Sequence, residues 1–129
     1  MSRRVVITGM GMVSPLGNDM ASSWEGIING RSGIGPITHY DATQFPTRIA
    51  GEIKDFDVTS DNPDYGKWRV SGKDAKKMDS FIHYGLAASF MAMHDAGLEI
   101  TEANAERSGA ILGAGIGGLL GIEEQTGKY

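Results

Sequence analysis

The order of hydrophobic and polar residues indicates alternating strands and helices. Residues 3–8 form a β-branched run closed by Gly9, which predicts a buried strand close to the N-terminus. Residues 20–29 carry apolar side chains at helical spacing and stop at Gly30, which predicts a short amphipathic helix. A second strand is expected at residues 47–53.

The longest helical pattern covers residues 73–96, and Gly97 ends it. Its apolar stripe predicts a central and largely buried helix. The stripe consists of Met78, Phe81, Ile82, Leu86, Phe90 and Met93. Residues 108–113 are small and apolar and predict a third strand.

The remaining segments connect these elements. Residues 31–46 contain many glycines and prolines and read as a loop, and residues 54–72 read as an ordered surface excursion. A short helix is expected at residues 101–106. Because no element signal closes the chain before Tyr129, we expect residues 1–129 to be an incomplete domain. The order strand, helix, strand, long helix, strand predicts an α/β fold.

Composition limits the function classes. With 129 residues, 40% of them hydrophobic, and a net charge of -4, the chain has room for at most one domain and is too apolar to be disordered. The absence of cysteine excludes disulfide scaffolds, thiolate zinc sites and a thiol nucleophile from this segment, and three histidines offer little for a metal. The mild acidity argues against nucleic acid, and no apolar run approaches the roughly 20 residues of a membrane span. We therefore expect a cytoplasmic protein.

Two motifs invite functional readings. Gly113, Gly115 and Gly118 match the spacing of a dinucleotide-binding loop, but the acidic residue expected about 20 positions later has no room. A nucleotide-binding α/β module stays open as an alternative. Asp79 and His83 share a helix face at i, i+4, where an ion pair is the simpler reading and a metal site the remote one.

Basic residues gather before and within the start of the long predicted helix. They are Lys67, Arg69, Lys73, Lys76 and Lys77. Lysines in the first turn oppose the helix dipole, so helix stability does not account for them. They form either a solvated face or a docking patch for an acidic protein partner.

Residues 4–17, with the sequence RVVITGMGMVSPLG, resemble the opening of the β-ketoacyl-acyl carrier protein synthases. Further segments similar to that family follow in order at residues 30–34, 77–85, 95–98 and 113–118, so the resemblance covers nearly the whole chain. Residues 58–72 look longer than the usual connection at that place.

The resemblance implies a thiolase-like fold, in which two pseudo-symmetric α/β halves form stacked layers and this chain supplies part of the first half. It implies a homodimer that elongates fatty acids by decarboxylative condensation of an acyl group with malonyl-acyl carrier protein, without a metal or an organic cofactor. The family's catalytic cysteine and two histidines are expected beyond Tyr129, so we predict that this segment alone is inactive.

The same resemblance suggests roles for five residues. Lys73, Lys76 and Lys77 match the family's basic patch that meets the acyl carrier protein. Ile116 matches a residue that gates the acyl pocket in elongating members of type II, and Gly115 belongs to the same pocket wall. A non-catalytic piece that binds carrier protein or forms a dimer is the other alternative.

Overall fold

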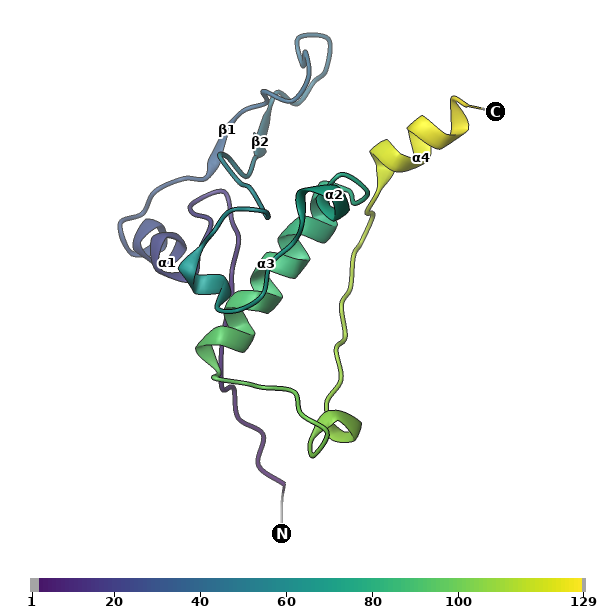
Figure 1. Ribbon diagram of the computed structural model, residues 1–129. Coiled ribbons are helices and arrows are strands. Elements are labelled where there is room, and N and C mark those ends of the chain that lie inside the picture. The colour runs from purple at the N-terminus through teal and green to yellow at the C-terminus, as the bar shows by residue number, and fades with distance from the viewer. Residues whose placement is uncertain (1–2, 129) are drawn as a thin grey trace.

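The computed structural model describes residues 3–128, and its elements are arranged around one long helix (Figure 1). In chain order the elements are α1 (Met20–Ile28), β1 (Ile34–Pro36), β2 (Ile49–Gly51), η1 (Pro63–Tyr65), α2 (Gly72–Ala75), α3 (Ser80–Asp95), η2 (Ala105–Arg107) and α4 (Leu119–Thr126). η1 and η2 are single 3-10 turns. None of the described helices is both long and apolar enough to cross a membrane.

Helix α3 is the element against which residues 9–13 of the N-terminal segment pack. That segment runs beside the helix (Figure 1), and its backbone comes so close that a Cβ at Gly11 would overlap the carbonyl oxygen of Ala88. Gly9 lies in the same way against Ala92 and Ala96. Side chains as small as alanine, spaced four residues apart on one helix face, make this close approach possible.

The buried core lies on a neighbouring face of α3. Its centre consists of Tyr65, Ala87 and Met91, with Val13, Phe56 and Phe90 packed around it. Tyr65 is only 2% exposed, and its ring meets that of Phe90 edge-on at 6.0 Å. Residues 54–72, expected to be a surface excursion, therefore contribute a principal core side chain through η1.

The predicted helix at residues 20–29 is confirmed as α1. Asp19 caps it, because its Oδ1 accepts a hydrogen bond from the Ser22 amide at 2.7 Å. Gly30 follows the helix with φ 63°, the left-handed conformation typical of a glycine after a helix end.

Strand β2 lies inside the predicted range 47–53, whereas β1 lies in the segment expected to be a loop. The two strands form an antiparallel hairpin in which Gly35 faces Ala50. β1 consists only of Ile34, Gly35 and Pro36. Such a sequence has no strand pattern of its own, and its pairing with β2 makes it a strand.

The long predicted helix at residues 73–96 is divided. Helix α2 ends at Ala75, and Asp79 has an extended conformation (φ -71°, ψ 157°) before α3 begins at Ser80. The apolar stripe begins at Met78, after α2 has ended, so the periodicity carried no information about where the helix is interrupted. The short helix expected at residues 101–106 is reduced to η2.

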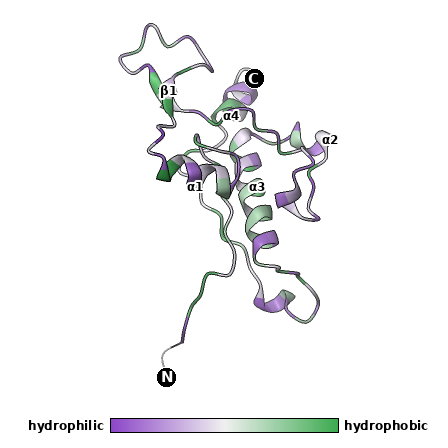
Figure 2. Ribbon diagram, turned by 90° about the vertical axis from the view of Figure 1, so that its left-hand side faces the viewer, coloured by the Kyte–Doolittle hydropathy of each residue, from purple (hydrophilic) through white to green (hydrophobic). Residues whose placement is uncertain are grey.

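The strands predicted at residues 3–8 and 108–113 are not formed within residues 3–128. Both segments are extended (Figure 1), but neither has a hydrogen-bonded neighbour there. Their apolar side chains lie uncovered, with Val5 91%, Ile7 82% and Ile111 100% exposed, and Figure 2 shows the hydrophobic N-terminal segment extending away from the rest. A strand requires a paired neighbour, so a strand-like sequence alone does not produce one.

Candidate functional site: a basic turn beside a glycine turn

The basic patch that the sequence predicted consists of three exposed lysines on one side of α2 and the turn after it. Lys73, Lys76 and Lys77 stand at i, i+3 and i+4, the spacing that puts side chains on a common helical face. Ala75 points the other way and is buried. Burial of Ala75 against the body of the chain therefore turns the three ammonium groups outward.

A short hydrogen-bond network shapes this turn. The Ser71 hydroxyl caps α2 by accepting from the Asp74 amide at 3.1 Å, and it donates to Asp74 Oδ2 at 2.7 Å. Lys77 Nζ lies 3.0 Å from Asp74 Oδ1. These two donors, Ser71 first and Lys77 second, hold the pKa of the Asp74 carboxyl below its ordinary value.

The lysines of the patch are not equivalent. Lys77 is ion-paired with Asp74, whereas Lys73 and Lys76 form no ion pair with any residue in the range 3–128. The other two basic residues of the cluster are also occupied, since Lys67 pairs with Glu99 and Arg69 pairs with Asp61. The free positive charge is therefore concentrated at Lys73 and Lys76.

His83 forms a hydrogen bond to the backbone of the turn that carries the lysines. Its Nε2 lies 2.9 Å from the carbonyl oxygen of Ala75 and must donate to it, because a carbonyl only accepts. The prediction of an ion pair between Asp79 and His83 is wrong. The imidazole of His83 bonds the end of α2, whereas the Asp79 carboxylate lies near Gly118 and Gly121.

The carboxylate of Asp79 points to the start of α4. Its Oδ2 lies 3.0 Å from where a Cβ would stand at either Gly118 or Gly121. Negative charge is favourable at this end of a helix. A bound pyrophosphate would need the same place and would be repelled by the carboxylate, so the geometry removes the support for the nucleotide-binding alternative.

Ile116 and Gly115, the predicted acyl-pocket residues, lie on the extended segment just before α4. Ile116 is 82% exposed, and a Cβ at Gly115 would meet no atom within 4 Å. No other residue of the described range 3–128 encloses this side chain, so its role as a pocket residue stays a prediction.

A groove of about 610 Å³ lies next to both predicted regions, because its lining includes Lys77 and Gly117, the residue after Ile116. It separates the start of α3 from α4, and Lys77 lies at its edge. The groove is lined mainly by Asp79, Phe81, Ile82, Gly117, Gly118 and Ile122. The structure thus brings Lys77 beside the turn that carries Ile116, while Lys73 and Lys76 lie outside the groove. Asp79 and Phe81 were not predicted to belong to this region, although an aspartate directly before a helix is a signal that the sequence contains.

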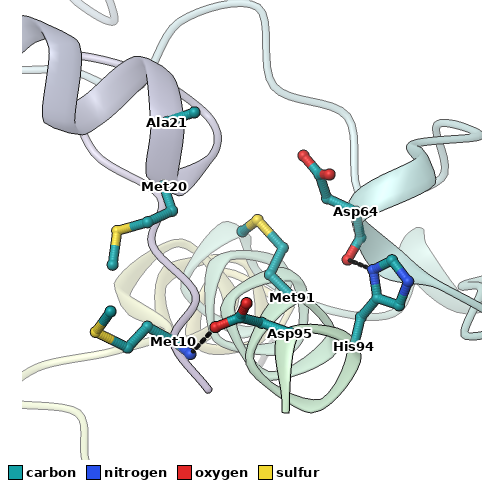
Figure 3. Close-up of a pocket in the computed structure, with 7 residues that line it drawn as sticks. All are labelled: Met10, Met20, Ala21, Asp64, Met91, His94 and Asp95. Carbon is teal, nitrogen blue, oxygen red and sulfur yellow. Dashed lines mark hydrogen bonds between the residues drawn. The ribbon is translucent and has the colours of Figure 1, made fainter. Parts of the chain in front are cut away.

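A separate cavity of about 570 Å³ lies between α1, η1 and α3 (Figure 3). Met10, Met20 and Met91 line it together with Ala21, Asp64, His94 and Asp95, and the side chains of His94 and Asp95 are already hydrogen-bonded. Asp95 Oδ2 accepts from the Met10 amide at 2.9 Å, and His94 Nδ1 donates to the Asp64 carbonyl at 3.2 Å. These bonds join three segments of the chain, so the polar groups have a structural role. No group of three or more metal-binding side chains occurs among the described residues.

The sequence matches the family described as "Beta-ketoacyl synthase, N-terminal domain" over residues 2–128. A 3-oxoacyl-[acyl-carrier-protein] synthase 2 from Vibrio harveyi is 57% identical over 121 residues, which are 94% of this chain and 27% of that protein. The synthase 2 from Synechocystis is 45% identical over 123 residues, or 95% of this chain and 28% of that protein.

A solved structure is also similar. It is titled "The ishigamide ketosynthase/chain length factor", has a TM-score of 0.58 and 36% identity, and is matched over 75% of this chain and 22% of its own chain. The chain therefore spans about 27% of the length of the curated relatives that it matches.

Proposed function

The chain belongs to the β-ketoacyl synthase family and corresponds to the N-terminal domain of that family. On this premise we propose that the protein of which this chain is a part elongates fatty acyl chains on acyl carrier protein. The observation that carries the proposal is the 57% identity to a 3-oxoacyl-[acyl-carrier-protein] synthase 2 across 94% of this chain. The whole-protein reaction is therefore a 3-oxoacyl-carrier synthase reaction, a transfer of acyl groups.

The proposed reaction has two stages. A cysteine thiolate attacks the thioester of an acyl carrier protein, takes the acyl group and releases the carrier thiol. Malonyl-acyl carrier protein then loses carbon dioxide, and the resulting carbanion attacks the acyl-cysteine thioester. The cysteine thiolate leaves, and the product is a 3-oxoacyl chain on the carrier. Such a reaction requires an activated thiolate and donors for the oxyanion.

This segment supplies binding surfaces and not the nucleophile. It contains no cysteine, so the acyl-accepting thiol must belong to another part of the protein. Its proposed contributions are the carrier-docking patch and one wall of the acyl site. We propose that the protein is cytoplasmic and forms a homodimer. Residues 1–129 would form the N-terminal part of its thiolase-like domain.

The patch of Lys73, Lys76 and Lys77 is proposed to dock the acidic acyl carrier protein. Exposed positive charge steers encounter and sets orientation, and the effect weakens as salt screens it. Because Lys73 and Lys76 carry no intramolecular partner in the described range, they are the two groups most available to a carboxylate of the carrier.

The test is a binding titration of acyl carrier protein to a full-length synthase carrying this segment. Changing Lys73, Lys76 and Lys77 to glutamate should weaken binding strongly at low salt, and the difference should shrink as salt is added. The single changes Lys73→Glu and Lys54→Glu form a matched pair, since both reverse one exposed lysine. Equal affinities for these two variants would count against the patch.

Acyl transfer distinguishes the proposal from the non-catalytic alternative. The full-length synthase should transfer the acyl group and release carbon dioxide, whereas a mere carrier-binding piece would bind the carrier without doing either. The isolated segment should do neither chemical step, because it lacks the thiol.

Ile116 is proposed to gate the acyl pocket, with Gly115 in the same wall. The support is its place in a glycine stretch beside the docking patch, with its side chain held by no neighbour in the described range. Ile116→Phe in the full-length synthase should shorten the acyl chain that is accepted. An unchanged ratio of short-chain to long-chain turnover would overturn this assignment.

A further inference from the structure

Two side chains at the start of α3 that lie close together in sequence, Asp79 and Phe81, lie against the start of α4. Asp79 occupies the N-cap position of α3, where an aspartate usually accepts a hydrogen bond from its own helix. It forms no such bond. Its Oδ2 instead lies against α4, 3.0 Å from the Cβ position of both Gly118 and Gly121.

Phe81 acts on the neighbouring residue of the same turn. A Cβ at Gly117 would lie 2.8 to 2.9 Å from three carbons of the Phe81 ring. Carbon atoms pack at about 3.5 to 4.0 Å, so the ring is in direct contact with the backbone of Gly117 and leaves no space for a side chain there. Phe81 is 39% exposed and lines the groove that also contains Lys77.

The segment on the other side of Ile116 has no such support. A Cβ atom added at Gly113 or Gly115 would meet no atom within 4 Å in the described range. The chain therefore packs against Asp79 and Phe81 on the C-terminal side of Ile116, whereas on its N-terminal side Gly113 and Gly115 have open space around them in the described range. Gly118, in the left-handed conformation with φ 73°, ends this packed part and directly precedes α4.

We propose that Asp79 and Phe81 are positioning residues for Ile116, which set the acyl-chain-length preference of the synthase by anchoring the turn at Gly117 and Gly118. This inference rests on the proposed function, because it assumes that Ile116 gates the acyl pocket. Asp79 acts by charge at the start of α4, and Phe81 acts by contact with Gly117. Neither side chain needs to touch the acyl group.

The experiment compares kcat/KM for a short-chain and a long-chain acyl carrier substrate in a full-length synthase carrying this segment. Asp79→Ala and Phe81→Ala should change the ratio of the two values by about tenfold, the scale at which a pocket discriminates a methylene. Asp79→Asn, which keeps the size of the side chain, should have a smaller effect in the same direction. Ser80→Ala, an exposed residue between the two, is the matched control and should leave the ratio unchanged.

The ratio of the short-chain to the long-chain kcat/KM distinguishes a positioning role from a loss of folded protein, because a smaller folded fraction lowers both kcat/KM values by the same factor. If Asp79→Ala does not fold, Asp79→Asn and Phe81→Leu provide the same comparison. An unchanged ratio in all of these variants, while Ile116→Phe shifts it, would overturn the inference and leave the gate intact. An unchanged ratio in Ile116→Phe as well would overturn the gate and the inference together.

Discussion

The imidazole Nε2 of His83 donates a hydrogen bond to the carbonyl oxygen of Ala75 at 2.9 Å. The bond joins the first turns of α3 to the last residue of α2, a helix of four residues that could not persist by itself. It anchors the turn that carries the lysines of the proposed docking patch to α3.

His83→Ala should lower the free energy of unfolding by about 1 kcal/mol, the usual net contribution of one hydrogen bond. Carrier affinity should fall as well, because the turn that presents Lys73 and Lys76 becomes mobile. His83→Gln keeps a side-chain N–H donor and should restore most of both quantities. Denaturant unfolding and a carrier titration measure them, and a glutamine variant as weak as the alanine variant would contradict this role.

Gly11→Ala should destabilise the protein by about 1 to 3 kcal/mol, the usual cost of overpacking. The added Cβ would overlap the Ala88 carbonyl oxygen, which belongs to the backbone of α3 and cannot move aside easily. Gly85→Ala is the control, because a Cβ at this helical position would meet nothing within 4 Å. It should be neutral or slightly stabilising, since alanine favours a helix more than glycine does.

Glu52 should make stability depend on acid pH. Thr38 donates to its carboxylate from the backbone at 2.8 Å and from the hydroxyl at 2.7 Å, and these bonds, with a weaker one from the His39 amide, lower the pKa of Glu52 below 4.5. A lowered pKa in the folded state means that this stabilisation is complete above pH 4.5 and is lost as the pH falls through the folded value.

Glu52→Gln should therefore reduce stability near neutral pH and flatten its decline in acid. Thermal unfolding at several pH values checks this prediction. The variant should approach the parent as the pH falls below 4.5, and parallel curves for the two proteins would show that Glu52 contributes nothing to the acid dependence.

Asp74→Asn should strengthen carrier binding. It removes the negative charge next to Lys77, which is paired with Asp74 at 3.0 Å, and leaves an amide that can still bond Ser71. We expect the association rate at low salt to rise by up to about fivefold, the scale of one exposed ion pair. Stopped-flow mixing with the carrier measures it, and a rate that falls would contradict the docking patch.

Several parts of the molecule could be predicted from the sequence because their causes are local. The range of α1 followed from its helical apolar spacing and from Gly30. The family resemblance, carried by the glycine and charge motifs, is confirmed by the β-ketoacyl synthase match. The thiolase-like fold is confirmed with it, and a solved ketosynthase/chain length factor is similar at a TM-score of 0.58.

The errors lie where distant residues decide the local structure. β1 exists because β2 pairs with it, and α4 begins at Leu119, directly after Gly118, where Asp79 and Phe81 at the start of α3 lie against the chain. The segments 3–8 and 108–113 have strand sequences but lack a paired neighbour within the described residues. The hydrophobic period of a segment indicates which of its sides is apolar, but not which other segment packs or pairs with it.

The candidate site divides in the same way. The sequence by itself determined that Lys73, Lys76 and Lys77 crowd into one short segment of a chain whose net charge is -4. Only the tertiary structure decided that Lys77 is neutralised by Asp74, that His83 bonds Ala75, and that Asp79 faces α4. Hydrogen bonds and ion pairs depend on distances of a few ångströms between side chains, and those distances are set only when the elements pack together.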